Sequence, residues 1–337
     1  MRAYIEINGN ALENNYLAIK KETGKDVIAV IKSNAYGHGL IECARILAKN
    51  KVPMFAVATI EEAIAIRKSL IFTPILLLGP CLDYRILSSY KITALILGEN
   101  HLQKLLKSPY PIQVHIMLDL GMNREGITLE QLDSVIERIY KSKLQLKGLC
   151  THYSSLANYE VVHEAFHQLQ TKYASMHLVF HSSATSTYLS NHDDNHFFRI
   201  GLALYGLDEK HTPVLSLKAP IIRKKFVQQG EKVGYDEMGV VAEDGYIYTI
   251  GLGYADGWPR NYRTSAYLGS TQLQQIGQTC MDYLMLFSKE NIDENSILTI
   301  IGEKKTVKMI AEEQNTIPYE VTTRLSMRLK RKTIYIK

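Results

Sequence analysis

The sequence predicts an α/β protein in which an N-terminal (β/α)8 TIM barrel is followed by a mainly β C-terminal domain. Three observations lead to this fold class. Short apolar segments alternate with amphipathic segments over the first 205 residues, the pattern changes after Leu207, and polar residues follow several of the apolar segments. The length of 337 residues suits two domains, and 46% hydrophobic with 22% charged residues exclude a disordered chain or a coiled-coil rod.

Eight segments of four to seven residues are rich in apolar and β-branched side chains, which is typical of parallel strands buried on both faces. Eight such strands favour a closed barrel over a doubly wound open sheet, which six strands would suit better. No Gly-x-Gly-x-x-Gly sequence follows the first of them, as a dinucleotide-binding sheet would require. The predicted strands are 27–31, 54–59, 75–78, 94–97, 114–118, 146–150, 177–180 and 198–204.

The amphipathic segments between these strands have apolar residues three and four positions apart, which is the spacing of a helix with one buried face. The segment 61–69 also begins with Glu61 and Glu62, and acidic residues stabilise a helix N-terminus. The predicted helices are 40–49, 61–69, 130–141 and 161–173.

After Leu207, strand-like segments follow one another with few helical segments between them, so we predict a second, mainly β domain. We place the barrel at residues 8–210 and the second domain at residues 211–337. The predicted strands of the second domain are 214–217, 246–251, 273–276, 283–287 and 297–301, and its predicted helices are 307–314 and a segment near 319–328.

Polar residues stand where the predicted barrel strands end, and the C-terminal ends of barrel strands line the active site of this fold. Lys32 follows the first strand, Arg124 the fifth, His152 the sixth, and the run 181–186 the seventh. Arg199 lies within the apolar eighth strand, where burial of a guanidinium is costly unless it is paired or hydrogen-bonded. A barrel would therefore bring these groups together.

A lysine beside hydroxyl groups and glycine N–H groups indicates chemistry with a phosphorylated aldehyde cofactor. The amine bonds to the aldehyde carbon, and burial and nearby cations lower its pKa and make it nucleophilic. Hydroxyl and backbone N–H groups bind a phosphate. Pyridoxal 5'-phosphate meets both requirements, so the sequence favours it as the cofactor.

The remaining features exclude several kinds of partner. The net charge of +5 is small for this length, and its densest cluster, residues 328–332, is predicted to be a solvated terminal segment without a nucleic-acid motif beside it. Four separated cysteines suggest reduced thiols, and neither a metal site nor disulfides. There is no signal-peptide pattern and no apolar window of about 18 residues, so we expect a cytoplasmic protein that binds neither a membrane nor nucleic acid.

Three motifs closely resemble those of the alanine racemase family. Residues 29–39 (Ala-Val-Ile-Lys-Ser-Asn-Ala-Tyr-Gly-His-Gly) resemble the cofactor-lysine motif, and residues 253–257 (Gly-Tyr-Ala-Asp-Gly) resemble the catalytic-tyrosine motif. Residues 277–282 (Gly-Gln-Thr-Cys-Met-Asp) resemble the Met-Asp substrate motif. The resemblance extends from residue 4 to residue 336. It implies a (β/α)8 barrel, a β domain that residues 1–7 join, and a head-to-tail homodimer whose active sites use both chains.

The resemblance also implies a role for each candidate residue. Lys32 and Tyr254 of the partner subunit are the two acid–base groups, and Lys32 also bonds to the cofactor. Arg199 faces the pyridine nitrogen, and His152 supports the phenol of Tyr254. Arg124 lies near the cofactor phenolate and the substrate carboxylate. The phosphate is held by Tyr36, Thr185 or Ser186, Gly201, Leu202 and Tyr319, and the substrate is approached from the partner chain by Met281 and Asp282.

Inversion at Cα requires removal of a proton on one face and return of a proton on the other, so lysine and tyrosine suit the reaction as two bases. A free phenol has a pKa near 10, so Tyr254 needs neighbours, such as His152 and Arg199, that stabilise its anion. A guanidinium does not readily protonate the pyridine ring, and an unprotonated ring is a weaker electron sink. The carbanion at Cα is therefore short-lived, which limits side reactions. Related barrel decarboxylases resemble one another in carrying a carboxylate at this position.

Three features of the sequence depart from the family pattern. Met117 stands where most members have a lysine that is carbamylated. A thioether cannot be carbamylated, so another polar group or a bound anion must orient Arg124. Ala184 and Thr185 replace the usual Asn-Ser, and Gln278 replaces an arginine. None of these changes removes a proton-transfer group.

The sequence thus predicts a pyridoxal-phosphate-dependent isomerase that interconverts L- and D-alanine and supplies D-alanine for peptidoglycan. A racemase for serine or for a wider set of amino acids is the alternative. A barrel decarboxylase is disfavoured by Arg199, and a non-catalytic cofactor-binding barrel is disfavoured by the β domain that carries Tyr254.

Overall fold

The computed structural model describes residues 2–153, 159–182 and 196–335, and the structural statements below concern these residues. The chain divides into two compact units. The barrel unit comprises Leu12–Ala35 and Cys43–His211, and the β unit comprises Met1–Ala11, Tyr36–Glu42 and Thr212–Lys337.

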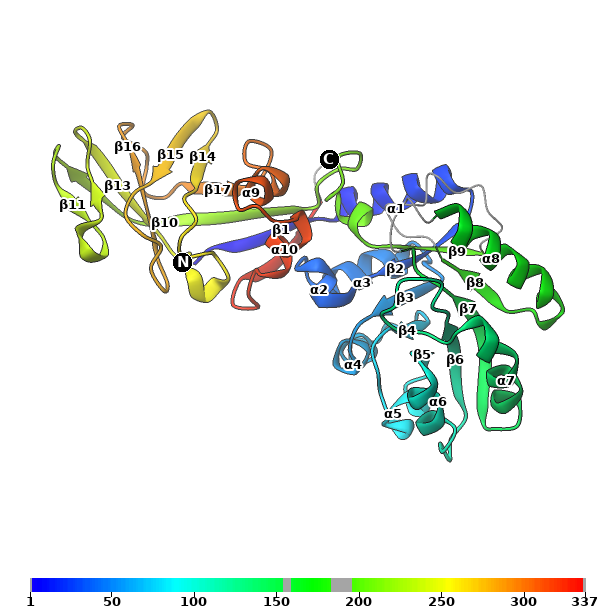
Figure 1. Ribbon diagram of the computed structural model, residues 1–337. Coiled ribbons are helices and arrows are strands. Elements are labelled where there is room, and N and C mark those ends of the chain that lie inside the picture. The colour runs from blue at the N-terminus through cyan, green and yellow to red at the C-terminus, as the bar shows by residue number, and fades with distance from the viewer. Residues whose placement is uncertain (1, 154–158, 183–195, 336–337) are drawn as a thin grey trace. The chain divides into compact units, whose positions relative to one another are not determined.

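In the barrel unit, eight parallel strands close into a barrel, which confirms the fold class that the sequence predicts (Figure 1). Each strand pairs with the next along the chain, and the last, β9 (Phe197–Ile200), pairs with the first, β2 (Asp26–Val30). Most of their side chains are buried, as expected of parallel strands with a packed interior and a cover of helices. The strands between them are β3 (Met54–Val57), β4 (Ile75–Leu77), β5 (Ile92–Ile96), β6 (Ile112–Met117), β7 (Leu144–Cys150) and β8 (Val179–His181).

Helices pack against the outside of these strands. α4 (Ile60–Lys68) contacts β3 and β4 and begins with a capping box in which Thr59 and Glu62 exchange hydrogen bonds. α7 (Leu129–Tyr140) packs an apolar stripe of leucine, valine and isoleucine against β7. The other right-handed helices before residue 211 are α1 (Gly9–Thr23), α3 (Leu40–Lys49), α5 (Tyr84–Ser89), α6 (Glu99–Leu105) and α8 (Tyr159–Lys172).

The eighth barrel strand is shorter than the sequence predicts. It ends at Ile200, because Gly201 turns the backbone (φ −121°, ψ −77°) and Leu202–Tyr205 form the 3₁₀ turn η3. Ala203, Leu204 and Tyr205 are nevertheless fully buried. The apolar run therefore continues through a change of backbone conformation, which hydrophobicity alone does not reveal.

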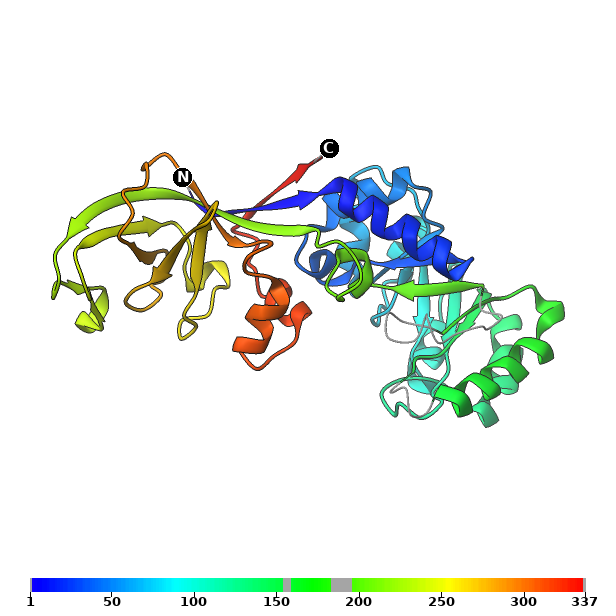
Figure 2. The same cartoon turned by 90° about the horizontal axis from the view of Figure 1, so that it is seen from above.

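The β unit contains an eight-stranded sheet in the order β13-β16-β15-β14-β17-β10-β1-β18. Its long strand β10 (Leu215–Val227, yellow-green in Figure 2) pairs in turn with β1 (Tyr4–Asn8), β17 (Ile297–Ile301) and β13 (Gly245–Ile250). Alternate side chains of β1 are buried, as in a strand with one face on a core. The remaining elements are β11 (Lys232–Val233), β12 (Gly239–Val240), β14 (Ser265–Leu268), β15 (Thr271–Gln275), β16 (Leu284–Ser288), α9 (Val307–Glu313), α10 (Pro318–Thr323) and β18 (Lys330–Ile334).

The basic run at residues 328–332 is largely exposed, as the sequence predicts, but it is also part of the sheet. It enters β18, which pairs parallel to β1 at the edge of the sheet. Lys330 and Lys332 are exposed there, and lysines on an edge strand discourage pairing with other chains. Arg331 instead donates hydrogen bonds to the carbonyl oxygen of Gly37 (3.0 and 3.2 Å).

Candidate active site

Lys32 begins a left-handed turn, α2 (Lys32–Tyr36), close to the end of β2. Residues 33–36 all have φ between 52° and 55°, a conformation that costs a non-glycine residue roughly 1–2 kcal/mol. The carboxylate of Glu62 accepts hydrogen bonds from the N–H groups of Asn34 (3.0 Å) and Ala58 (2.9 Å). Glu62 thus stabilises the turn and fixes the point at which the lysine side chain leaves the backbone.

The amine of Lys32 is surrounded by charges of both signs. Burial is the largest cause that lowers its pKa, and Arg124 and Arg199 lower the pKa further. Glu62 and Glu125 act in the opposite direction. A lowered pKa raises the fraction of neutral amine near pH 7, and the neutral amine is the form that acts as a nucleophile or a base.

Arg199 of β9 is only 7% exposed, and the acceptors that the described residues offer to its guanidinium are all uncharged. Nη1 donates to Nδ1 (2.6 Å) and to the carbonyl oxygen (2.7 Å) of His181. Nη2 donates to the carbonyl oxygens of Thr151 (2.5 Å) and Ser182 (3.2 Å) and to Nδ1 of His152 (3.3 Å). These bonds replace water without neutralising the charge of the arginine.

The histidines near Arg199 are neutral, and their hydrogen bonds determine their tautomers. Burial and the charge of Arg199 lower the pKa values of His115 and His152 to about 3 and that of His181 well below its ordinary range. Because Nδ1 of His181 accepts from Arg199, its proton lies on Nε2, which donates to Nδ1 of His115 (2.8 Å). By the same reasoning, Nε2 of His152 carries that residue's proton.

Arg124 lies in the loop that follows β6 and pairs with its neighbour Glu125. Nη2 of the arginine donates to Oε1 of Glu125 (2.5 Å) and Nε donates to Oε2, so one edge of the guanidinium is bound bidentately. Asp119 shapes the loop, because its Oδ1 accepts two hydrogen bonds of 3.0 Å from loop N–H groups. Met117 is buried at the end of β6 and contributes no charge.

In the β unit, Tyr36 meets Tyr319 edge to face, with ring centroids 6.4 Å apart and planes at 81°. Burial raises the pKa of Tyr36 to about 12, so its phenol keeps its proton and can donate a hydrogen bond. The backbone after Tyr36 lies directly against α10, because a Cβ atom on Gly37 would be 2.0 Å from the carbonyl oxygen of Thr322. Only glycine allows this close approach of the backbone at position 37 to the helix that carries Tyr319.

Tyr254 begins the 3₁₀ turn η5 (Tyr254–Asp256) and is 41% exposed. Its N–H donates to the carbonyl oxygen of Cys280 (3.1 Å), and the next N–H along the chain donates to that of Met281 (3.0 Å). The tyrosine turn therefore lies directly against the segment that contains Met281 and Asp282.

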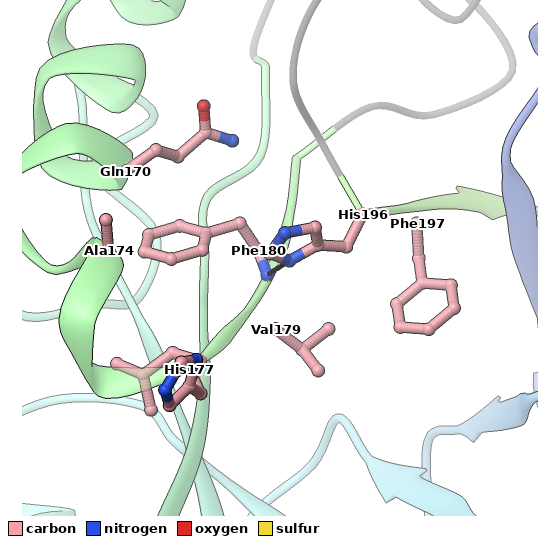
Figure 3. A pocket seen from close by; sticks show the side chains of 8 residues that line it. Gln170, Ala174, His177, Val179, Phe180, His196 and Phe197 are labelled. Atoms are coloured by element: carbon pink, nitrogen blue, oxygen red, sulfur yellow. Dashed lines mark hydrogen bonds between the residues drawn. The ribbon is translucent and has the colours of Figure 1, made fainter.

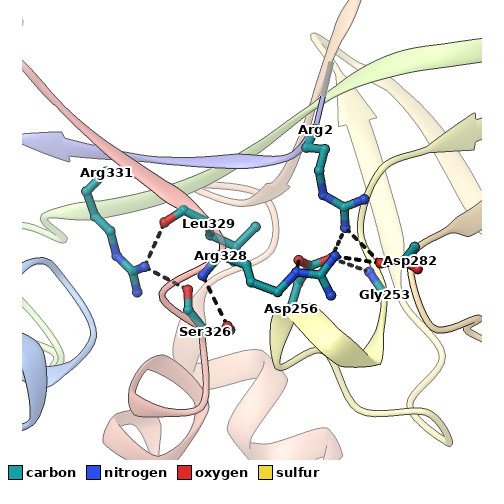
Figure 4. A network of polar contacts seen from close by, with 8 residues as sticks. All are labelled: Arg2, Gly253, Asp256, Asp282, Ser326, Arg328, Leu329 and Arg331. Atoms are coloured by element: carbon teal, nitrogen blue, oxygen red, sulfur yellow. Dashed lines mark hydrogen bonds and ion pairs between the residues drawn. The ribbon is translucent and has the colours of Figure 1, made fainter.

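The carboxylate of Asp256, which is completely buried, holds this turn in place (Figure 4). Oδ2 accepts hydrogen bonds from Nη2 of Arg2 (2.6 Å) and from the N–H of Gly253 (3.0 Å). Arg328 lies 3.5 Å from Oδ1 of Asp256 and donates to Oδ1 of Asp282 (2.6 Å). We call Arg2, Asp256, Asp282 and Arg328 the arginine clamp, since its two arginines join the two aspartates.

The candidate residues thus form separate groups. In the barrel unit, Lys32, Arg124, His152 and Arg199 act on one another electrostatically, and Gly201 and Leu202 stand at the start of η3. In the β unit, Tyr36 meets Tyr319, and Tyr254 lies beside Met281 and Asp282. Thr185 and Ser186 lie outside the described residues.

Comparison with known proteins identifies the family of this chain. Residues 7–209 match the family "Alanine racemase, N-terminal domain", and residues 214–333 match "Alanine racemase, C-terminal domain". The chain belongs to the alanine racemase family. An alanine racemase of Helicobacter pylori (strain J99 / ATCC 700824) is 32% identical, with 98% of each chain covered. The solved alanine racemase of Clostridium difficile 630 is 27% identical and has a TM-score of 0.92, with 99% of this chain and 96% of that chain covered.

One similar protein is named an amino-acid racemase and not an alanine racemase. An amino-acid racemase of Enterococcus faecalis is 31% identical over 97% of this chain. The match covers 51% of that protein, so this chain spans about half the length of the relative. Membership of the alanine racemase family confirms the resemblance that the three motifs indicate.

Three further observations concern membrane spans, metal sites and a pocket. Within the described residues, no helix is both long and apolar enough to cross a membrane, and no cluster of three or more histidine, cysteine, aspartate or glutamate side chains could bind a metal ion. A pocket of about 480 Å³ lies at the N-terminal ends of β8 and β9, where Phe180, His196 and Phe197 are among its lining residues (Figure 3). None of the candidate residues that the structure describes lines this pocket.

Sequence reasoning missed the carboxylates that hold the candidate residues. Glu62 carries a signal, because it stands three residues after Thr59 in a capping box, but that pattern indicates only a helix start. Asp256 lies inside the tyrosine motif without any sign that two arginines bind it. Glu125 gives no signal, since a contact between neighbours in a loop follows no periodic pattern.

Proposed function

We propose that this protein is a pyridoxal-phosphate-dependent racemase that interconverts L- and D-alanine by two bases and supplies D-alanine for peptidoglycan. The observation that carries the proposal is that a partly buried lysine of lowered pKa lies within electrostatic reach of a buried arginine whose described partners are all uncharged. We further propose a cytoplasmic homodimer with shared active sites. Its domains would be residues 8–210 and residues 211–337 joined by residues 1–7.

The residues present fit the proposed cofactor. Lys32 supplies an amine whose pKa is lowered by burial, as covalent attachment to an aldehyde requires. Arg124 and Arg199 supply positive charge for an anionic cofactor, while Glu62 and Glu125 are already bound by N–H groups and by Arg124. Tyr36, Gly201, Leu202 and Tyr319 would hold the phosphate, and Arg199 would face the ring nitrogen. When bound, the cofactor supplies a conjugated ring that withdraws electrons from the Cα–H bond of the amino acid.

Lys32 would take or return a proton at Cα on one face through Nζ, and Tyr254 of the partner subunit would do so on the other face through its phenol oxygen. His152 supports the tyrosine, because a neutral imidazole with its proton on Nε2 can donate a hydrogen bond to a phenolate. Arg199 fixes that tautomer by occupying Nδ1. The phenolate of Tyr254 would therefore be stabilised by a hydrogen bond from neutral His152 and not by the positive charge of a protonated histidine.

The substrate would be oriented by its carboxylate. Arg124 would bind the carboxylate from the barrel unit, and Met281 and Asp282 would approach it from the partner chain. A racemase for serine or for a wider set of amino acids is the second candidate. It is favoured by the Enterococcus faecalis relative that is named an amino-acid racemase.

The test is a racemisation assay with the purified protein and pyridoxal phosphate. Single L-amino acids are supplied, and the loss of circular dichroism is followed with time. The proposal expects L-alanine to racemise fastest. Faster racemisation of serine would favour the second candidate, and no racemisation of any amino acid would contradict both.

A further inference from the structure

The loop after β6 carries a carboxylate to which the proposed reaction gives no role. Both oxygens of Glu125 bind Arg124, the residue immediately before it. The side chain of Glu125 is 23% exposed, whereas that of Arg124 is 53% exposed. The pair therefore withdraws the carboxylate from water and leaves the arginine accessible to a ligand.

Arg124 keeps hydrogen-bond donors for a second partner. Nε and Nη2 bind Glu125, and no atom of the described residues accepts a hydrogen bond from Nη1. A guanidinium has five N–H groups, of which one bidentate carboxylate occupies two. The edge that contains Nη1 therefore suits one further carboxylate, which under the proposed function belongs to the amino acid.

The charge of Glu125 also acts on the reacting group. It raises the pKa of Lys32 and that of the buried Cys150 thiol at the end of β7. Glu62, the other carboxylate that acts on Lys32, is bound by three backbone N–H groups and is part of the left-handed turn. The negative charges of Glu62 and Glu125 thus both act on Lys32. Only Glu125 is bound to Arg124, the arginine that would receive the substrate.

We propose that Glu125 is a specificity-determining residue, which holds Arg124 for the α-carboxylate of the substrate and repels an amino acid whose side chain carries a second carboxylate. The inference rests on the proposed function and names its substrate class as amino acids with uncharged or cationic side chains. Two like charges about 10 Å apart repel enough, at an effective dielectric constant of about 20, for roughly a tenfold loss of affinity.

Equilibrium binding of two unreactive acids tests the inference. Propionate carries one carboxylate and succinate carries two, and neither has an amino group. Their dissociation constants are measured by titration calorimetry at low salt, where charge effects are least screened, on the holoenzyme and on Glu125→Gln. Glu99→Gln is the matched control, because Glu99 also pairs with an arginine, Arg138 (2.8 Å), and does not act on Lys32.

The quantity of interest is the ratio of the succinate to the propionate dissociation constant, in which any general loss of affinity cancels. We expect Glu125→Gln to lower this ratio about tenfold and Glu99→Gln to leave it unchanged. Arg124→Lys should weaken both acids and keep the ratio within about threefold, since Glu125 remains. An unchanged ratio in Glu125→Gln, or a holoenzyme that does not bind propionate, would overturn the inference.

Racemisation of L-alanine by the same samples separates the two proposals. A lowered ratio without racemisation contradicts the proposed function but supports the selectivity of the site for one carboxylate. An unchanged ratio in an active racemase contradicts the role of Glu125 alone.

Discussion

Nη1 of Arg199 donates a hydrogen bond of 2.6 Å to Nδ1 of His181, and this contact determines the state of both side chains. The histidine must be neutral to accept, and the arginine keeps its positive charge because its partner is neutral. His181 in turn donates to His115, so a buried series of hydrogen bonds leads from the site into the barrel interior. A carboxylate in place of His181 would neutralise the arginine, and a hydrophobic side chain would leave a donor unsatisfied.

Replacement of His181 should therefore separate hydrogen bonding from packing. His181→Leu removes an acceptor from a buried guanidinium and should lower the free energy of unfolding by about 2–3 kcal/mol. His181→Asn places an amide oxygen near the position of Nδ1 and should lose less. Urea denaturation followed by far-ultraviolet circular dichroism measures both, and equal losses would show that Arg199 does not depend on this acceptor.

The neutral histidines should make the barrel sensitive to acid. The pKa of His115 is about 3 in the folded protein and ordinarily 6.5, so below about pH 6.5 the unfolded chain binds a proton that the folded chain does not. The contribution to stability is complete above pH 6.5 and is lost as the pH falls toward 3. The free energy of unfolding that is lost between pH 6.5 and pH 5 is about 2 kcal/mol.

Denaturation at pH 7 and pH 5 checks this contribution. His115→Asn should lower the number of protons taken up on unfolding at pH 5 by about one. The control is His177→Asn, because His177 is exposed in a left-handed conformation that asparagine adopts readily. The same pH dependence in wild type and His115→Asn would refute a neutral buried histidine.

Lys32→Ala should abolish the visible absorbance of the purified protein incubated with pyridoxal phosphate, because the amine is the proposed point of covalent attachment. Lys141→Ala, which changes an exposed lysine at the end of α7, should leave the spectrum intact. The spectra are recorded after removal of free cofactor. A band that persists in Lys32→Ala would assign the attachment to another residue.

The arginine clamp predicts that Asp256 positions Tyr254 without taking part in proton transfer. Asp256→Asn removes the charge that binds Arg2 and Arg328, and it should lower the free energy of unfolding of the β unit by about 2 kcal/mol. It should also lower the rate of racemisation at least about tenfold while the cofactor spectrum is unchanged. Fluorescence of Trp258, the single tryptophan, reports unfolding next to this turn.

A surface pair provides the control for the clamp. Glu243→Gln breaks an exposed ion pair with Lys289 (2.6 Å) and should change stability by less than about 1 kcal/mol. If Asp256→Asn behaves like Glu243→Gln in both stability and rate, the clamp does not position the tyrosine.

The barrel was predictable because strands buried on both faces produce continuous apolar runs, and all eight runs correspond to strands. The strand β18 was not, since a segment of Lys-Arg-Lys-Thr-Ile at a sheet edge has neither an apolar run nor an alternating pattern. The helix α1 was also missed, because its apolar residues are interrupted by asparagine and lysine. Elements stabilised mainly by pairing with distant segments leave little trace in the local sequence.

The candidate site was predictable only as far as its motifs extend. Lys32, Arg199 and Tyr254 stand in recognisable patterns, whereas Glu62 and Glu125 act through contacts that the fold creates. The left-handed turn after Lys32 is equally hidden, because four successive non-glycine residues ordinarily avoid that conformation. Sequence motifs thus identify the groups that are proposed to react, and the structure identifies the groups that hold them.

The central claim is that Lys32 and Tyr254 of the partner subunit act on opposite faces of the substrate. Incorporation of deuterium at Cα from D₂O measures each face, with L-alanine and D-alanine as separate starting materials. Tyr254→Phe removes one base and should slow incorporation from L-alanine at least about tenfold more than from D-alanine, whereas Tyr283→Phe, at another exposed tyrosine, should slow neither. Equal slowing from both enantiomers in Tyr254→Phe would contradict the two-base account.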